Sequence, residues 1–191
     1  MIITWLGQHC FKIEGRTATV IVDPVTGQSG RAMRHSTDIV VLPTPLSDKE
    51  RESYKGASLV VDCPGEYESK GLFVECQIAG DKQTLLTRLE VEGMRIGHLG
   101  TLTERDEAAE NFLEDVDILF VPVGNDGGLG PTIAAAVVSA IEPRIVIPMA
   151  YKDVQKFCQA LGAKPTEPQS KLSINKKDLP NEETRLIILE A

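Results

Sequence analysis

Three segments of the chain share one pattern, in which a charged residue precedes a short apolar run that ends in proline and a small or polar loop. They read "DIVVLPTP", "DILFVPVG" and "RIVIPMAY", and "TVIVDPV" and "LVVDCPG" are close variants. Near-continuous apolar runs of this length are typical of strands covered on both faces. If the strands are aligned, their C-terminal loops meet at one edge, where α/β proteins form clefts. The pattern predicts a layered α/β protein whose cleft is lined by Asp23, Thr44, Cys63, His98, Thr101, Asn125 and Tyr151.

The 191 residues suit a single domain spanning 1–191 with a sizeable core. Helices are expected from an S-x-x-E capping box at 47–50, at 103–114, from Thr132 to Pro143, and after Asp153 up to Gly162. A hairpin turn is expected at Glu92-Gly93.

The charge balance excludes several classes of partner. The net charge is −8, with 28 acidic and 20 basic residues, whereas nucleic acids and anionic membranes attract clustered Lys and Arg.

The first residues, "MIITWLGQHCFKI", have no basic region of a signal peptide, and no apolar run approaches the ~20 residues of a membrane span. The four cysteines lack CxxC spacing, so we expect reduced thiols in a cytoplasmic protein.

Several loops, taken in order, carry a family resemblance. "ITWLGQHCFKIEG", "VIVDP", "DIVVLPT", "DCPGEYESKGLFV", "RIGHLGTL", "DVDILFVPVG" and "IEPRIVIPMAY" together resemble the metallo-β-lactamase superfamily. The branch that they resemble is that of small stand-alone metal-dependent hydrolases related to the L-ascorbate-6-phosphate lactonases. The resemblance implies an αββα sandwich of two mixed β-sheets flanked by helices, and zinc or manganese in active members.

The metal-binding loop departs from the family pattern. Active members carry T-H-x-H-x-D-H after the strand that corresponds to "DIVVL". Aligning Thr44 with the threonine of the motif places Pro45 and Ser47 at the first two histidines, Lys49 at the aspartate and Glu50 at the last histidine. Zinc requires at least three imidazole, thiolate or carboxylate ligands, and a lysine ammonium would repel it.

The other ligand positions follow the same trend. Thr101 stands where the resemblance implies a metal-bridging aspartate, and Ala150 stands where it implies the last histidine. Gln8-His9 occupies the place of His-Ser in the G-H-S-like start of the family pattern. The resemblance therefore predicts a non-catalytic member without the metal centre and without a cofactor, with a binding, scaffolding or regulatory role. The expected partner is a second copy of the chain or an active paralogue, and neither nucleic acid nor a membrane.

Other roles for the cleft stay open at this point. His98 could be a ligand or an acid–base group, although a histidine that hydrogen-bonds neighbouring loops is favoured. A hydrolase of esters, lactones or phosphoesters could use a relocated site around His9, Cys63 and His98, or a metal held by Asp23, His98 and Asp126. A third reading is a small-molecule sensor whose ligand is held by the glycine-rich loop "GNDGGLGP".

Overall fold

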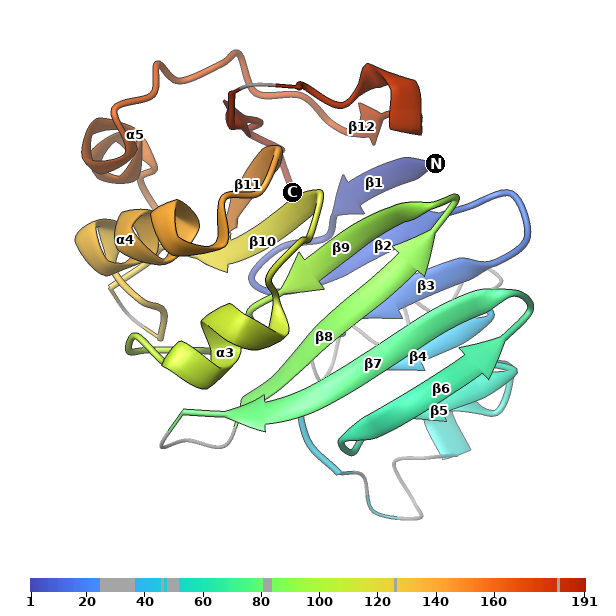
Figure 1. The fold of residues 1–191 in the computed structure, drawn as a ribbon. Coiled ribbons are helices and arrows are strands. Elements are labelled where there is room, and N and C mark those ends of the chain that lie inside the picture. Colours follow the sequence, from blue (N-terminus) through green and yellow to red (C-terminus); the bar gives the residue numbers. More distant parts are fainter. Residues whose placement is uncertain (25–36, 46, 48–51, 81–83, 126, 182) are drawn as a thin grey trace.

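The chain folds, in a computed structural model, into two β-sheets that lie face to face (Figure 1). The structure describes residues 1–24, 37–45, 47, 52–80, 84–125, 127–181 and 183–191. Within these ranges, every helix falls short of the length and apolarity that crossing a bilayer requires. The expected architecture of two mixed sheets with helices outside is confirmed.

The first sheet has the strand order β12-β1-β2-β3-β4-β5, and the second has the order β13-β11-β10-β9-β8-β7-β6. The strands of the first sheet are β1 (Ile2–Trp5), β2 (Phe11–Glu14), β3 (Thr19–Val22), β4 (Ile39–Val41), β5 (Leu59–Val61) and β12 (Leu172–Ser173). Those of the second are β6 (Gly65–Ser69), β7 (Leu72–Ala79), β8 (Thr84–Val91), β9 (Met94–His98), β10 (Ile118–Pro122), β11 (Ile145–Met149) and β13 (Arg185–Leu186).

Both sheets combine parallel and antiparallel pairs. In the first, β3 pairs parallel with β4, and β4 with β5, while β1 and β2 are antiparallel. In the second, β9, β10, β11 and β13 run parallel, and β6, β7 and β8 are antiparallel. Every residue of β10 and β11 is buried, as predicted for apolar runs covered on both faces. The parallel strands carry their C-terminal loops to a common edge.

Two apolar layers hold the sheets. Between the sheets, the rings of Phe11 on β2 and Phe120 on β10 stack with centroids 3.9 Å apart, which joins the two strands across the core. Outside the second sheet lie α3 (Glu107–Phe112), α4 (Pro131–Ile141) and α5 (Gln155–Leu161), which cover a second apolar cluster (Figure 1). Outside the first sheet, Tyr54 from the 3-10 turn η1 (Glu52–Tyr54) packs on β4.

The helix boundaries were only partly predictable. The expected start of a helix at Thr103 is wrong, because α3 begins at Glu107. Asp106 explains the later start: its Oδ1 accepts from Ala109 N at 3.0 Å and its Oδ2 accepts from Gly80 N at 2.7 Å, so one carboxylate caps the helix and holds a distant loop. The capping box at 47–50 lies mostly outside the described residues.

The two later helices follow their sequence signals. Helix α4 begins at Pro131 and ends before Glu142, which takes a left-handed conformation and is followed by the expected proline. Before α5, Asp153 Oδ1 accepts from Gln155 N at 2.9 Å, and Gly162 ends the helix with φ +70°. The short segment η2 (Lys176–Asp178) follows β12.

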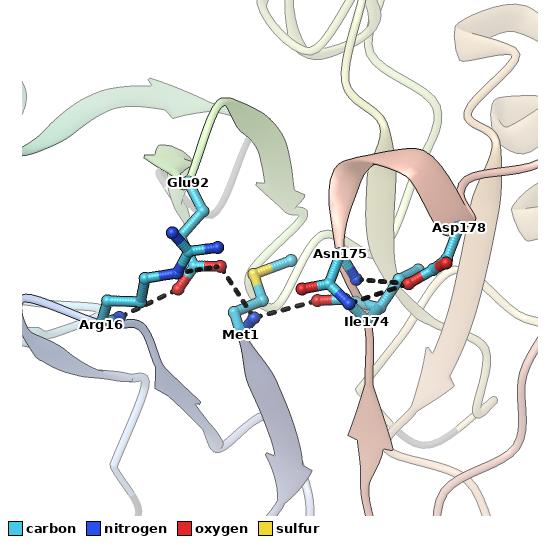
Figure 2. Close-up of polar contacts among 6 residues, drawn as sticks. All are labelled: Met1, Arg16, Glu92, Ile174, Asn175 and Asp178. Atoms are coloured by element: carbon cyan, nitrogen blue, oxygen red, sulfur yellow. Dashed lines mark hydrogen bonds and ion pairs between the residues drawn. The ribbon is translucent and has the colours of Figure 1, made fainter.

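The predicted hairpin is confirmed, and its turn joins three distant segments. Glu92 and Gly93 connect β8 and β9 with φ angles of +53° and +73°, as a two-residue hairpin turn requires. Glu92 Oε2 accepts from the Met1 ammonium at 3.0 Å, and that ammonium also donates to Ile174 O at 2.9 Å (Figure 2). Glu92 Oε1 accepts from Arg16 N at 2.9 Å. One carboxylate thus ties β1 and the β2–β3 turn to the hairpin.

Candidate functional site

A cavity of about 610 Å³ opens where β10 and β11 end. Three of the residues expected to line a cleft, His9, Asn125 and Tyr151, lie in its wall. The other lining residues come from the end of β1 and the turn after it, the segment from the end of β10 to the start of α4, the segment from the end of β11 into α5, and the C-terminal residue: Trp5, Gly7, Gln8, Val123, Gly124, Pro131, Ala150, Lys152, Asp153, Lys156 and Ala191.

The floor of the cavity is a contact between two strained turns. Gln8 and Ala150 both have left-handed backbones, with φ angles of +49° and +54°, which L-residues other than glycine rarely adopt. Gln8 O accepts from Ala150 N at 3.0 Å and from Trp5 Nε1 at 2.9 Å. The indole of Trp5 in turn stacks on the ring of Tyr151, with centroids 5.2 Å apart. The two turns therefore hold each other in place, and backbone strain of this kind is concentrated at functional sites.

The glycines of the loop before α4 are required by close backbone contacts. A Cβ on Gly124 would lie 2.0 Å from Ala150 O. A Cβ on Gly128 would lie 2.8 Å from the carbonyl oxygens of Gly124 and Pro122. In its described part the loop folds back on β10, with Leu129 N donating to Pro122 O at 2.9 Å. The loop is thus a compact wall of the cavity.

His9 carries an unsatisfied nitrogen at this wall. Its Nε2 is buried and has no hydrogen-bond partner. Burial lowers the pKa of the imidazole, and a hydrogen bond to the backbone of Gly127 opposes the shift. The ring is therefore neutral near pH 7.

His98 lies in the core between the sheets. It is 1% exposed, its Nε2 donates to His9 O at 2.8 Å, and its Nδ1 accepts from Gly100 N at 3.0 Å. Its ring meets Phe11 and Phe120 edge to face. Burial lowers the pKa of His98 to about 4, so the ring is neutral. With both nitrogens bonded to backbone, His98 joins two loops and offers no free lone pair to a metal or a substrate.

Asp23 faces a small pocket beside His98, separate from the large cavity. It follows β3 with φ +52°, and its backbone N donates to Val41 O at 2.8 Å. Its Oδ2 is buried without a hydrogen-bond partner, and burial raises the pKa of the carboxyl to about 6.

The remaining expected cleft residues are dispersed. Thr44 is exposed, and the hydroxyl of Thr101 lies 2.7 Å from that of Thr84, whose Oγ1 also accepts from Thr101 N at 2.9 Å. Cys63 is exposed, with its Sγ 3.3 Å from Tyr67 Oη. Asp126 lies outside the described residues.

Sequence reasoning missed the parts of the cavity that come from α5 and from aromatic stacking. Lys152 lies between β11 and α5, and Lys156 is the second residue of α5; their position directly after a buried strand was the available signal. The stacking of Trp5 on Tyr151 joins residues 146 positions apart in the chain (151 − 5), so no local sequence pattern predicts it.

The side chains of the described residues do not fit the metal centre that the family resemblance implies. Across the described ranges, no three His, Cys, Asp or Glu side chains lie close enough together to hold a metal ion. His9 Nε2 and Asp23 Oδ2 are two unpaired atoms at two different pockets, whereas zinc needs at least three protein ligands at one point. Ala150 contributes no donor. No chemical step is therefore derived through a metal.

Comparison with known proteins agrees with this fold. Residues 2–150 match the model of the family described as "Beta-lactamase superfamily domain". A UPF0173 protein of Pyrococcus furiosus is 28% identical over 176 residues, covering 79% of this chain and 83% of that protein. A UPF0173 metal-dependent hydrolase of Lysinibacillus sphaericus is 39% identical over 64 residues, covering 33% of this chain and 28% of the relative. A Thermotoga maritima structure, described as a zinc-dependent hydrolase of the metallo-β-lactamase superfamily, superposes with a TM-score of 0.77 at 23% identity, with 100% of each chain covered.

Proposed function

The chain belongs to the β-lactamase superfamily, and from that premise we propose that it is a non-catalytic member whose cleft binds rather than hydrolyses. The observation that carries the proposal is that the family's histidine or aspartate is replaced at every aligned ligand position, and that Glu50 alone among the replacements keeps a side chain that binds zinc well. A protein of this fold stays stable without a metal, because its apolar layers hold the sheets together.

The loop after β4 supports the proposal. Aligned on Thr44, the motif positions are taken by Pro45, Ser47, Lys49 and Glu50. Proline has no side-chain donor, a serine hydroxyl is a weak zinc ligand, and a lysine ammonium repels a cation. Lys49 and Glu50 lie outside the described residues, so the argument at Lys49 rests on residue type, while the carboxylate of Glu50 could serve as one ligand only.

Thr101 and Ala150 support it from the opposite sheet. Thr101 stands at the position of the bridging aspartate, and its hydroxyl and its backbone N–H are both bonded to Thr84 Oγ1. Ala150 stands at the position of the last histidine and turns a left-handed backbone towards Gln8. Both positions have become parts of the local hydrogen-bond structure.

A metal-dependent hydrolase with a relocated site is the alternative. The Lysinibacillus sphaericus relative, which is described as a metal-dependent hydrolase, supports this alternative, and so do the unpaired buried atoms of His9 and Asp23. Against it, His98 uses both ring nitrogens for backbone hydrogen bonds, and Cys63 lies beside Tyr67. Because His9 Nε2 and Asp23 Oδ2 lie at two different pockets, the alternative needs at least two further ligands from residues that the structure does not describe.

The test is the metal content of the untagged protein, measured by elemental mass spectrometry before and after loading with zinc and with manganese. The same samples are assayed with ester, lactone and phosphoester substrates, with the Lysinibacillus sphaericus relative as positive control. We expect metal far below one ion per chain and no hydrolysis that a chelator abolishes. One or two tightly held ions together with chelator-sensitive hydrolysis would refute the proposal.

A further inference from the structure

We propose that the free edge of strand β6 binds an extended, lysine- or arginine-rich segment of a partner protein as an added antiparallel strand. Strand β6 (Gly65–Ser69) ends the order of the second sheet, and β7 is its partner among the described strands. Figure 1 shows β6 at the rim of the sheet, beyond the part that the helices cover. The inference goes beyond the proposed function, because this edge contributes no residue to the cavity described above.

The turn between β6 and β7 fixes the hydrogen-bond pattern of β6. Lys70 and Gly71 form a two-residue hairpin turn with φ angles of +53° and +73°. The residues that flank such a turn, Ser69 and Leu72, form a hydrogen-bonded pair. Hydrogen-bonded and non-hydrogen-bonded pairs alternate along an antiparallel ladder, so every second residue of β6 bonds to β7.

The other residues of β6, Glu66 and Glu68, direct their backbone groups to the open edge. They stand opposite Glu75 and Phe73 at non-hydrogen-bonded positions, so their N–H and C=O groups point away from β7. Within the described ranges, the backbone of these two residues has no hydrogen bond to another segment. An edge of this kind is a template for a further strand, and extended peptides bind other proteins by this mode.

The charge of the edge selects a cationic strand. The side chains of Glu66 and Glu68 are exposed, and neither forms an ion pair with a described residue, whereas the neighbouring Glu75 is paired with Arg88. A residue of an added strand that stands directly opposite Glu66 or Glu68 has its Cβ about 5 Å away, and opposite charges at that position are favourable. The same two residues therefore supply both the free backbone groups and the charges that a lysine or arginine complements.

A second copy of β6 does not fit this edge. Antiparallel pairing of β6 with itself about Tyr67 would set Glu66 opposite Glu68 on both sides, and like charges directly opposite each other destabilise a sheet. The net charge of −8 adds a general preference for a basic partner.

The inner face of β6 sets the residue type between the cations. Tyr67 is half-buried against the core, and its hydroxyl donates to Cys63 O at 3.0 Å. A residue opposite Tyr67 faces the same side and is therefore best apolar. On the outer face, Phe73 is 38% exposed beside Glu68, so it offers apolar surface to the aliphatic stem of a long cationic side chain. The expected partner segment alternates basic and apolar residues.

The experiment follows backbone amide hydrogen exchange by NMR while the protein is titrated with a capped pentapeptide of alternating lysine and valine, with lysine at both ends. In the free protein, the amides of Glu66 and Glu68 should exchange rapidly, whereas the amide of Tyr67, which faces β7, should already be protected. Saturation with the peptide should slow exchange at Glu66 and Glu68 by at least about ten-fold. Charge attraction without an added strand would leave these two amides unprotected.

Three altered peptides serve as controls. N-methylation of the lysine nitrogens removes the N–H groups that face β6, so it should weaken binding at least about ten-fold. N-methylation of the valine nitrogens alters groups that face away from β6 and should leave binding unchanged. A peptide of alternating glutamate and valine should not bind.

Variants tie the binding to β6. The double change Glu66→Gln and Glu68→Gln keeps side-chain shape and should weaken binding about five-fold at low salt. The matched change Glu167→Gln and Glu183→Gln removes two exposed charges outside β6 and should leave binding unchanged. Glu68→Pro removes an edge N–H without removing a hydrogen bond to β7, so it should weaken binding more than Glu68→Gln does. Thermal unfolding of each variant verifies the fold.

Several outcomes would overturn the inference. They are unprotected amides at Glu66 and Glu68 in the presence of millimolar peptide, equal binding of the glutamate peptide, and equal binding of the peptide with N-methylated lysines. Protection of the same amides by dimerisation without peptide would identify a second copy as the occupant and would also overturn it. None of these outcomes bears on the proposed function, which the metal content of the protein tests separately.

Discussion

Replacing Asp23 with asparagine should stabilise the protein at neutral and alkaline pH. The Oδ2 of Asp23 is buried without a hydrogen-bond partner, and burial raises the pKa of the carboxyl from 3.8 to about 6. Asparagine has nearly the same shape but no charge to desolvate, and it tolerates the left-handed backbone at φ +52° well.

The size of the effect follows from the two pKa values. The difference between 3.8 in the unfolded chain and about 6 in the folded protein, at 1.36 kcal/mol per pKa unit, corresponds to about 3 kcal/mol. Above pH 6 the carboxylate is charged in both states, so the folded state bears the full cost. Between pH 6 and 3.8 the folded protein takes up the proton first and the cost disappears. Asp23→Asn should therefore gain about 3 kcal/mol at pH 8 and almost nothing near pH 4.

The assay is urea unfolding at pH 8, 6 and 4, followed by circular dichroism and by Trp5 fluorescence. Asp38→Asn is the matched control, because Asp38 is ion-paired with Lys70 and accepts from Thr19 N at 2.8 Å. These contacts lower the pKa of Asp38, so its loss should destabilise the protein, and the loss should shrink as the pH falls. A variant of Asp23 that is less stable than the parent at pH 8, or whose gain does not depend on pH, would refute the reasoning that burial of an unpaired charge destabilises the folded state.

Three further changes test the turns around the site. Gly124→Ala should cost about 3 kcal/mol or more in unfolding free energy, because its Cβ would lie 2.0 Å from Ala150 O, whereas Gly56→Ala, which meets open space, should stay within about 0.5 kcal/mol of the parent in urea unfolding. Ala150→Gly should raise the melting temperature slightly, since relief of the left-handed strain at φ +54° (about 1–2 kcal/mol) exceeds the entropic cost of glycine (about 0.5–1 kcal/mol); a lower melting temperature would contradict this. Glu92→Gln should destabilise the protein by on the order of 1 kcal/mol at pH 7, since the Met1 ammonium loses its carboxylate. The ion pair lowers the pKa of Glu92, so the stability that it adds is complete above its usual pKa of 4.5 and lost at lower pH; an effect that persists in acid would contradict the assignment.

Local sequence rules predicted an element correctly where the residues that determine it are neighbours in the chain. The apolar runs of β10 and β11 predicted strands buried on both faces, and Glu92-Gly93 predicted the hairpin turn. They failed at α3, where Thr103 offered a plausible cap. The carboxylate of Asp106 was selected because it also binds Gly80 N, and that contact appears only in the folded chain.

For the candidate site, too, the sequence predicted some features and missed others. The sequence placed His9, Asn125 and Tyr151 near strand ends, and the structure brings these three to one cavity. Asp23 and His98 also follow or end strands, but they line a different pocket. A position at a strand end therefore does not predict which pocket a side chain faces, because side chains at one edge of the two sheets can point in different directions.

By itself the sequence determined the family and most of the strands, because periodicity and loop motifs depend on contiguous residues. It also determined that Pro45, Ser47 and Ala150 can supply no strong zinc ligand. Only the tertiary structure decided that His98 is a core histidine with both nitrogens bonded, that Asp23 carries an unpaired buried oxygen, and that two lysines border a cavity floored by strained turns. Burial, hydrogen-bond partners and cavity shape depend on atoms that are far apart in the chain, so they exist only once the two sheets have packed.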